Sequence, residues 1–161
     1  MAKVAIVMGS KNDLPVVQPA IDILNKFDIG IEVRVLSAHR VPDDVKEFVV
    51  SCNKNGTAAI IAAAGKAAHL AGVCAAYTVL PVIGLPVQSS LMGGLDSLLS
   101  MVQMPDGVPV ATVAVNGAKN AGILAAQIIA VADKELTKKL RLFKKDMADK
   151  VLADDKELQS P

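Results

Sequence analysis

The sequence predicts an α/β fold, a three-layer sandwich in which helices cover both faces of a doubly wound parallel sheet of flavodoxin-like order. Five short apolar segments alternate with segments of helical periodicity, and this alternation is typical of βαβ units and a parallel sheet. The right-handed crossovers of such units place helices on both faces of the sheet. The length of 161 residues fits one domain of roughly 100–200 residues. We therefore expect a single domain over residues 1–161.

The first half of the chain predicts two strand–helix pairs. The apolar run 3–9 ends at a glycine, which is typical of a buried strand. A helix with apolar residues at helical spacing begins near Leu14 and ends before residue 28. The second strand, 31–36, precedes a helix over 42–53, whose first-turn proline and acidic residues are helix-start signals.

The second half repeats this alternation. Strands are predicted over 58–63, 82–85 and 110–115, each from a short apolar run bounded by turn residues. An alanine-rich helix ending near Tyr77 follows the first of these strands, and helices over 95–103 and 120–132 follow the other two. Five strands with this spacing favour the flavodoxin-like order 2-1-3-4-5.

A C-terminal amphipathic helix is predicted over about 134–152, where Lys, Asp and Glu are dense. Its apolar residues recur at steps of three and four and form one stripe, expected to pack on the same domain or on a neighbouring subunit. The stripe consists of Leu136, Leu140, Phe143, Met147 and Val151.

The preceding helix differs, because residues 121–132 are apolar on nearly all sides and only Gln127 is polar. A helix that is apolar all round is expected to be buried on every side. In a domain of this size that burial requires a subunit interface, so the sequence predicts a homo-oligomer.

Several classes of partner and location are disfavoured by composition. A net charge of +1 gives no reason to expect nucleic acid or an anionic membrane. Prolines and glycines interrupt the uncharged stretch 70–95, so it predicts a helix, a strand and a loop in place of a membrane span. The first strand begins within three residues, which argues against a signal peptide. Cys52 and Cys74 show no metal-type spacing, and we expect reduced, buried thiols of a cytoplasmic protein.

The segment Ser37-Ala38-His39-Arg40 lies where the second strand passes into a helix. In open parallel sheets, ligands bind at this carboxyl edge. A histidine exchanges a proton near neutral pH, and an arginine holds a phosphate by paired hydrogen bonds. The alternative interpretation is a helix-capping histidine beside a solvated arginine.

Two other polar loops follow the first and third strands and converge on the same edge. One contains Ser10 and Asp13, and the other runs from Gly65 to His69. The first loop is neither GxGxxG nor a P-loop, but its backbone N–H groups could bind a phosphate; alternatively it is an N-cap cluster. His39 and His69 have no second His or Cys at ligand spacing, so a metal site is not expected. General acid–base catalysis on a bound small molecule remains as a use of histidine here; alternatively, His69 is a hydrogen-bonded histidine at the start of a helix.

Several longer segments resemble one known family over residues 3 to about 152. They are VAIVMGSKND, LSAHRVP, AAAGKAAHLAG, LPVIGLPVQ and GLDSLLSMVQMPDGVPVATVAVNGAKNAG. Together they resemble the PurE family, and specifically its class I members. The resemblance implies a three-layer α/β fold, an octamer, and active sites built from several subunits.

The reaction that the resemblance implies belongs to de novo purine (IMP) biosynthesis. The carboxylate on the exocyclic nitrogen of N5-carboxyaminoimidazole ribonucleotide (N5-CAIR) is moved to ring carbon C4, which yields 4-carboxyaminoimidazole ribonucleotide (CAIR). Carbon dioxide is released and recaptured in this mutase reaction, and no metal, ATP or organic cofactor is used.

The resemblance also implies roles for individual residues. His39 is the general acid and base, and Ser10, Asp13 and Arg40 bind the ribonucleotide, with Arg40 on the phosphate. Ser37 and Ala38 in the same motif belong to the substrate-binding set. The carbon dioxide is enclosed by one loop, of which Gly65, Lys66, Ala67, His69 and Leu70 are counted as binding residues.

The chain departs from the family pattern at Asn12, where Ser is common, and at Lys66, where a second Gly is common. The Lys66 ammonium could attract the substrate carboxylate or point to solvent. One alternative function is the class II carboxylase of the same family, which joins free carbon dioxide to aminoimidazole ribonucleotide (AIR). That class usually has Lys after the first histidine and lacks the second, so Arg40 and His69 favour the mutase, while Lys66 is a weak contrary sign. A non-catalytic nucleotide-sensing domain is a more distant alternative.

Overall fold

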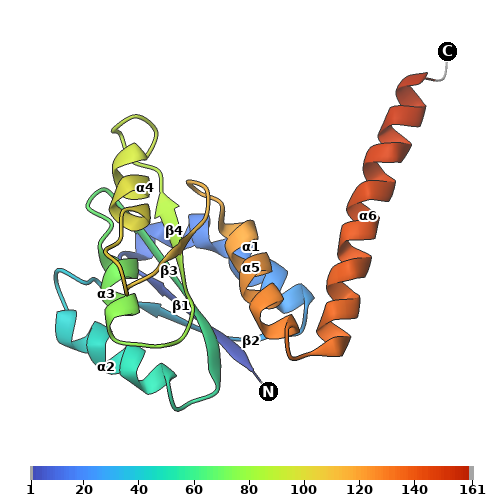
Figure 1. Cartoon of the computed structure of the whole chain (residues 1–161). Helices are drawn as coiled ribbons and strands as arrows, with labels where there is room; N and C mark the ends of the chain where they lie inside the picture. The colour runs from blue at the N-terminus through green and yellow to red at the C-terminus, as the bar shows by residue number, and fades with distance from the viewer. Residues whose placement is uncertain (1, 160–161) are drawn as a thin grey trace.

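The sheet consists of five parallel strands in the order β2-β1-β3-β4-β5, as the sequence predicts. The structure is a computed structural model that describes residues 2–159, and Figure 1 shows the arrangement of its elements. The ends of the predicted domain, residue 1 and residues 160–161, lie outside the described residues. The strands are β1 (Lys3–Met8), β2 (Gly30–Val35), β3 (Thr57–Gly65), β4 (Val82–Val87) and β5 (Ala111–Thr112).

Helices cover both faces of this sheet, which confirms the three-layer prediction. Helices α1 (Leu14–Lys26) and α5 (Ala118–Ala130) pack on one face. The other face is covered by α2 (Pro42–Cys52), α3 (Leu70–Ala76) and α4 (Leu95–Val102). The two groups lie on opposite sides of the strands in Figure 1.

The central strands are buried on both faces because alternate side chains enter different layers. In β1, Val4, Ile6 and Met8 pack with α1 and α5, whereas Ala5 and Val7 pack with α2 and α3. This alternation follows from the two-residue period of a strand, and it explains why β1 is a continuous apolar run.

The predicted bounds of three strands are wrong. Strand β5 covers only residues 111–112 of the predicted 110–115, because it pairs with β4 at Ile83 and Gly84 alone before the chain turns away. Strands β3 and β4 extend beyond their predicted ends at 63 and 85, because their ladder continues to the pair Gly65–Val87.

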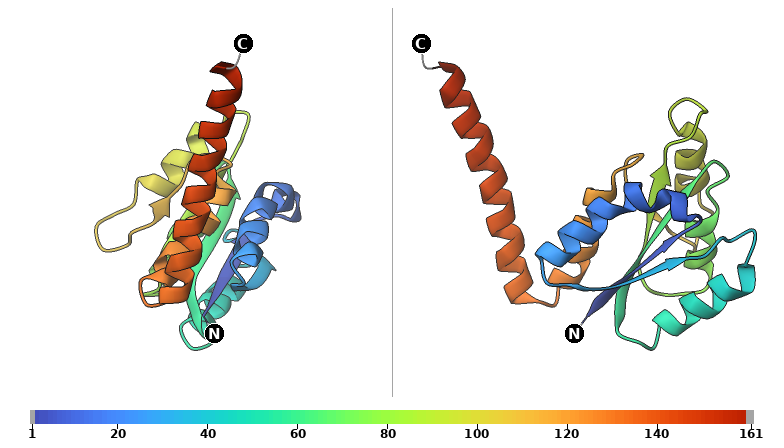
Figure 2. Two further views of the ribbon diagram at one scale, coloured as in Figure 1. Left: turned by 90° about the vertical axis from the view of Figure 1, so that its right-hand side faces the viewer. Right: turned by 180° about the vertical axis from the view of Figure 1, so that it is seen from behind.

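The last helix, α6 (Lys134–Gln159), extends past the predicted end at 152. Its first half packs on α5 through the buried residues Leu136 and Phe143. The second half of the predicted stripe remains uncovered, since Met147 is 46% exposed and Val151 is 66% exposed. In Figures 1 and 2, α6 meets the rest of the chain near its N-terminal end and then projects away from the sheet.

The expectation that residues 121–132 are buried on every side is not met within this chain. Ala121, Ala125 and Ala126 face α1 and the sheet and are buried, but Gln127 is exposed and Ile128 is only half-buried. The helix lies in an outer layer, so the sheet and α1 cover only part of its circumference.

The cysteine prediction is confirmed, since Cys52 and Cys74 are both free and buried. Burial raises the pKa of the Cys74 thiol to about 12, so that thiol stays protonated and unreactive at neutral pH. Among the helices of residues 2–159, none combines the length and apolar character that crossing a membrane requires.

Candidate active site

A cavity of about 400 Å³ opens at the carboxyl edge of the sheet. The loops after β1, β2, β3 and β4 enclose it, so the convergence of polar loops predicted from sequence is present in the structure. Its wall includes all of the predicted site residues except His69. They are Ser10, Asp13, Ser37, Ala38, His39, Arg40, Gly65, Lys66, Ala67 and Leu70.

The loop after β1 forms one turn of 3-10 helix, η1 (Lys11–Asp13), before α1. Ser10 is its N-cap, and the Ser10 Oγ accepts a hydrogen bond of 3.2 Å from the backbone N–H of Asn12. The predicted N-cap cluster is therefore present, in addition to the position of Ser10 on the cavity wall. Asp13 is half-buried, and this burial raises the pKa of its carboxyl. A hydrogen bond from the backbone of Ser10 and the positive charge of Arg40 oppose that rise.

Arg40 connects the loops after β1 and β2. Its Nη2 donates to the carbonyl of Gly9 at 2.8 Å, and its Nε donates to Ser37 Oγ at 3.2 Å. The guanidinium carries five N–H donors, so donors remain for a ligand. Arg40 is exposed to solvent, as the alternative interpretation expects, but these two bonds hold its guanidinium at the cavity.

His39 contacts His69, which lies in the loop before α3. The His39 Nε2 lies 2.9 Å from the His69 Nδ1, and the two rings meet nearly at right angles, with centroids 5.0 Å apart. The capping role considered for His39 is not seen, since the N-cap of α2 is Val41 and no side chain bonds there. His69 thus reaches the site through His39, although it does not line the cavity itself.

Comparisons with known proteins show the family of this chain. A family model described as AIR carboxylase matches residues 3–150. The chain belongs to the AIR carboxylase family. Curated relatives include the N5-carboxyaminoimidazole ribonucleotide mutase of Saccharolobus solfataricus, which is 52% identical over 95% of this chain and 97% of its own length. That of Thermotoga maritima is 50% identical over 99% of this chain and 93% of its own length.

Solved structures give the same assignment. The crystal structure of Treponema denticola PurE superposes with a TM-score of 0.90 at 28% identity, covering 98% of this chain and 99% of that one. The likeness to the AIR carboxylase family therefore extends from the sequence to the whole fold.

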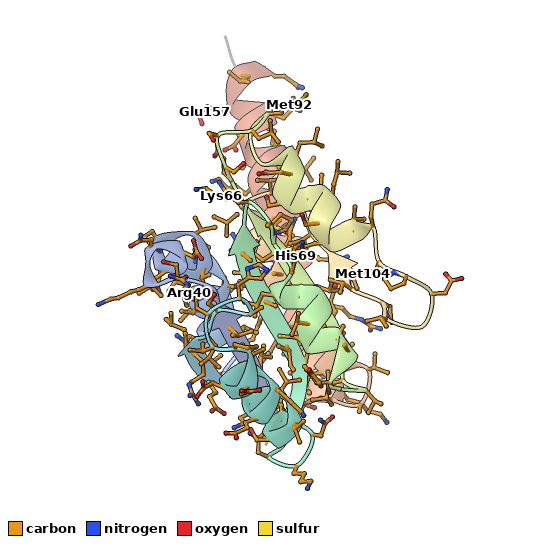
Figure 3. All side chains as sticks on the ribbon, turned by 90° about the vertical axis from the view of Figure 1, so that its left-hand side faces the viewer. Arg40, Lys66, His69, Met92, Met104 and Glu157 are labelled. Carbon is orange, nitrogen blue, oxygen red and sulfur yellow. The ribbon has the colours of Figure 1, made fainter. Side chains whose placement is uncertain are left out.

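Lys66 departs from the glycine that is common in the PurE pattern, and its backbone explains that preference. Its φ of +57° lies in the left-handed region, which glycine adopts without steric cost and which is unfavourable for lysine. The side chain is exposed at the cavity wall. Figure 3 shows Lys66, His69 and Arg40 on one face of the molecule.

Sequence reasoning missed Gln88 and Ser89, which line the cavity from the loop after β4. The signal was available, because these polar residues directly follow an apolar strand, as the three predicted loops do. Within residues 2–159, no group of three or more His, Cys, Asp or Glu side chains is arranged to hold a metal ion.

Proposed function

We propose that the protein is an N5-carboxyaminoimidazole ribonucleotide mutase of de novo purine (IMP) biosynthesis, an isomerase that converts N5-CAIR to CAIR. The observation that carries this proposal is the cavity in which His39 and Arg40 lie side by side, in a chain that is about half identical to curated mutases over nearly its whole length. A cavity of about 400 Å³ is within the usual range for small-molecule sites.

Binding of the ribonucleotide is assigned to the loops after β1 and β2. Arg40 binds the phosphate, because the bonds to Gly9 and Ser37 orient its remaining N–H donors. Ser10 and Asp13 supply a hydroxyl and a carboxylate group for the ribose. With the phosphate and the ribose bound in this way, the aminoimidazole ring of the substrate lies near His39.

His39 acts as acid and then as base. Protonated His39 donates its proton to the exocyclic nitrogen as the N–C bond to the carboxylate breaks and the bond electrons stay on nitrogen. The products of this step are AIR and carbon dioxide. Ring carbon C4 then attacks the carbon dioxide, and His39 removes the C4 proton to restore aromaticity. His39 ends in the state in which it began, so no external acid, base or cofactor is consumed.

Retention of carbon dioxide is assigned to the loop from Gly65 to Leu70, with Ala64 and Ala67 as small apolar walls on the cavity. Holding the gas beside C4 makes recapture effectively unimolecular. His69 holds the His39 ring by the 2.9 Å contact and so sets which His39 nitrogen faces the substrate.

The assay that tests this function follows CAIR by its ultraviolet absorbance, with N5-CAIR as substrate and bicarbonate held low. The label of a carboxyl-labelled substrate is expected to remain in CAIR. The description of the matching family model favours one alternative, AIR carboxylation. Complete loss of the label, with fast product formation only from AIR and carbon dioxide, would replace the mutase by that carboxylase.

The proposal extends to the assembly and its location. We expect one domain over residues 1–161 acting as a cytoplasmic homo-octamer, without nucleic acid or membrane partners. The exposed apolar residues Met147 and Val151 on α6 support an oligomer, whereas the number of subunits comes from the family resemblance alone. Sedimentation velocity at micromolar concentration tests this, and a monomer would contradict it.

A further inference from the structure

Two loops that are distant in sequence are joined beside the cavity by Gln88 and Asn116. Gln88 directly follows β4 and lines the cavity, whereas Asn116 lies in the connection between β5 and α5. The backbone N–H of Gln88 donates to Asn116 Oδ1 at 2.9 Å, and Asn116 Nδ2 donates to Gln88 Oε1 at 3.2 Å. One asparagine side chain therefore binds both the main chain and the side chain of the glutamine.

The backbone of Asn116 is shaped for this contact. Its φ is +57°, a left-handed conformation that asparagine tolerates better than most residues. Its N–H donates to the carbonyl of Pro86 at 2.8 Å, and its carbonyl accepts from Ala118 at 2.9 Å. The backbone of Asn116 is thus bonded on both sides, to Pro86 near the end of strand β4 and to Ala118 at the start of α5. Unfavourable backbone conformations of this kind are often found at functional sites.

These bonds determine which way the Gln88 amide faces. Because Oε1 accepts from Asn116, the Nε2 amine is the end of the amide left for a ligand, and it has no hydrogen bond within residues 2–159. The neighbouring Ser89 cannot supply the same donor, since its hydroxyl donates to Asp96 at 2.6 Å.

The position of Gln88 indicates which part of the substrate it meets. In the ladder, Gly65 pairs with Val87, so Lys66 and Gln88 leave the sheet side by side. The loop that begins at Gly65 is the one assigned above to carbon dioxide. An amide N–H beside that loop is placed to donate to an oxygen of the migrating carboxyl group.

We propose that Gln88 binds the carboxyl group through Nε2, and that Asn116 is the positioning residue that sets the direction of the amide. This inference rests on the proposed mutase function. It assigns to the loops after β4 and β5 a role in distinguishing carboxylated from uncarboxylated ribonucleotides.

The experiment is the variant Asn116→Asp, which keeps the Oδ1 acceptor and tolerates the same backbone but replaces the Nδ2 donor by an oxygen. The Gln88 amide then reverses to donate Nε2 to the new carboxylate, and it presents Oε1 to the cavity. Binding of CAIR, measured by titration calorimetry, is expected to weaken about tenfold or more, which is the usual effect of losing a hydrogen bond to a charged group. Binding of AIR, which lacks the carboxyl group, is expected to stay within twofold.

Further variants separate a positioning role of Asn116 from general damage to the fold. Gln88→Glu leaves Asn116 intact, keeps the Oε1 acceptor and removes Nε2, so it is expected to give the same selective loss of CAIR binding even where Asn116→Asp folds poorly. In a Gln88→Ala background, Asn116→Asp is expected to add less than twofold, because Asn116 acts through Gln88. Asn120→Asp makes the same charge change on the exposed first turn of α5 and is expected to bind both ligands as the unaltered chain does.

The inference would be overturned if Asn116→Asp weakened CAIR binding and AIR binding equally. It would also be overturned if CAIR binding were unchanged in Asn116→Asp, or unchanged in Gln88→Glu. Failure of the proposed function gives a different result, since the unaltered chain would then neither bind these ribonucleotides nor turn over N5-CAIR.

Discussion

The Nε2 atom of His39 lies 2.9 Å from the Nδ1 atom of His69, although 30 positions separate the two residues in sequence. The chain holds two histidines in all, and the structure places both in one hydrogen-bonded pair at the edge of the cavity. The N–H of one ring is therefore donated to the ring nitrogen of the other, with the direction set by the tautomers. A histidine pair on the cavity edge is suited to acid–base chemistry.

His39→Asn is expected to abolish turnover of N5-CAIR while ribonucleotide binding stays within about tenfold, because the variant removes proton transfer and leaves the phosphate site intact. Turnover by ultraviolet absorbance and binding by calorimetry are measured on the same sample. Near-normal turnover would rule out His39 as the acid–base group.

His69→Ala is expected to lower kcat by about tenfold to a hundredfold with little change in KM, because His39 then loses the partner that orients its ring. His69→Gln, which restores a hydrogen-bonding side chain without a titrating group, is expected to recover part of that loss. Equal kcat values for the alanine variant and the unaltered chain would show that the 2.9 Å contact has no catalytic effect.

Arg40→Lys is expected to raise KM about tenfold to a hundredfold, because an ammonium cannot replace both the bonds to Gly9 and Ser37 and the paired bonds to a phosphate. Steady-state kinetics measure this effect. The control is Arg34→Lys on β2, where the guanidinium stacks on Phe48 away from the cavity wall, and its KM is expected to be unchanged. A similar rise in both variants would indicate a general effect of replacing a guanidinium by an ammonium, and not the loss of bonds at the cavity.

Asp13→Asn is expected to raise the melting temperature at pH 7 and to weaken ribonucleotide binding. Burial raises the pKa of the folded carboxyl above its usual value of 3.8, so the unfolded chain loses the Asp13 proton at lower pH than the folded chain does. Stability from this group is therefore complete below pH 3.8 and falls as pH rises through the folded pKa. Thermal melts at pH 7 and pH 4.5 measure the gain, which is expected to shrink at the lower pH. A gain that grows on acidification would contradict the direction of the shift.

Lys66→Gly is expected to stabilise the fold by up to about 1 kcal/mol, because glycine removes the steric cost of the left-handed backbone but loses more entropy on folding. It is also expected to raise KM for N5-CAIR about twofold to fivefold at low salt, since a cation on the cavity wall attracts the anionic substrate, and this difference is expected to fade with added salt. Urea unfolding and kinetics at two salt concentrations test both parts. If KM is unchanged at low salt, Lys66 points to solvent and has no part in binding the carboxylate.

The amino-acid pattern alone determined the layers of this fold, the strand order and the three predicted loops of the site. Apolar runs bounded by glycine and polar residues after strand ends are local features, and the geometry of βαβ units then brings the carboxyl ends together. For that reason the sequence alone predicts that Ser10, Arg40 and Gly65 lie at one edge of the sheet.

Contacts between loops were decided only by the tertiary structure. The pairs His39–His69 and Gln88–Asn116 join positions 30 and 28 residues apart, and each depends on how two loops bend above the sheet. The spacing of apolar residues along the sequence does not predict how these loops bend. Left-handed backbone at Lys66 and Asn116 is equally hidden in sequence, because neither residue is a glycine that would mark it.

The C-terminal helix also combines a feature that the sequence predicts with one that only the tertiary structure decides. Its heptad-like stripe predicted an amphipathic helix, but the surface available on α5 decided that only the part near Leu136 and Phe143 is buried within the chain. Local pattern therefore specifies which face of a helix is apolar, whereas the length of that face that finds a partner depends on the size of the neighbouring elements.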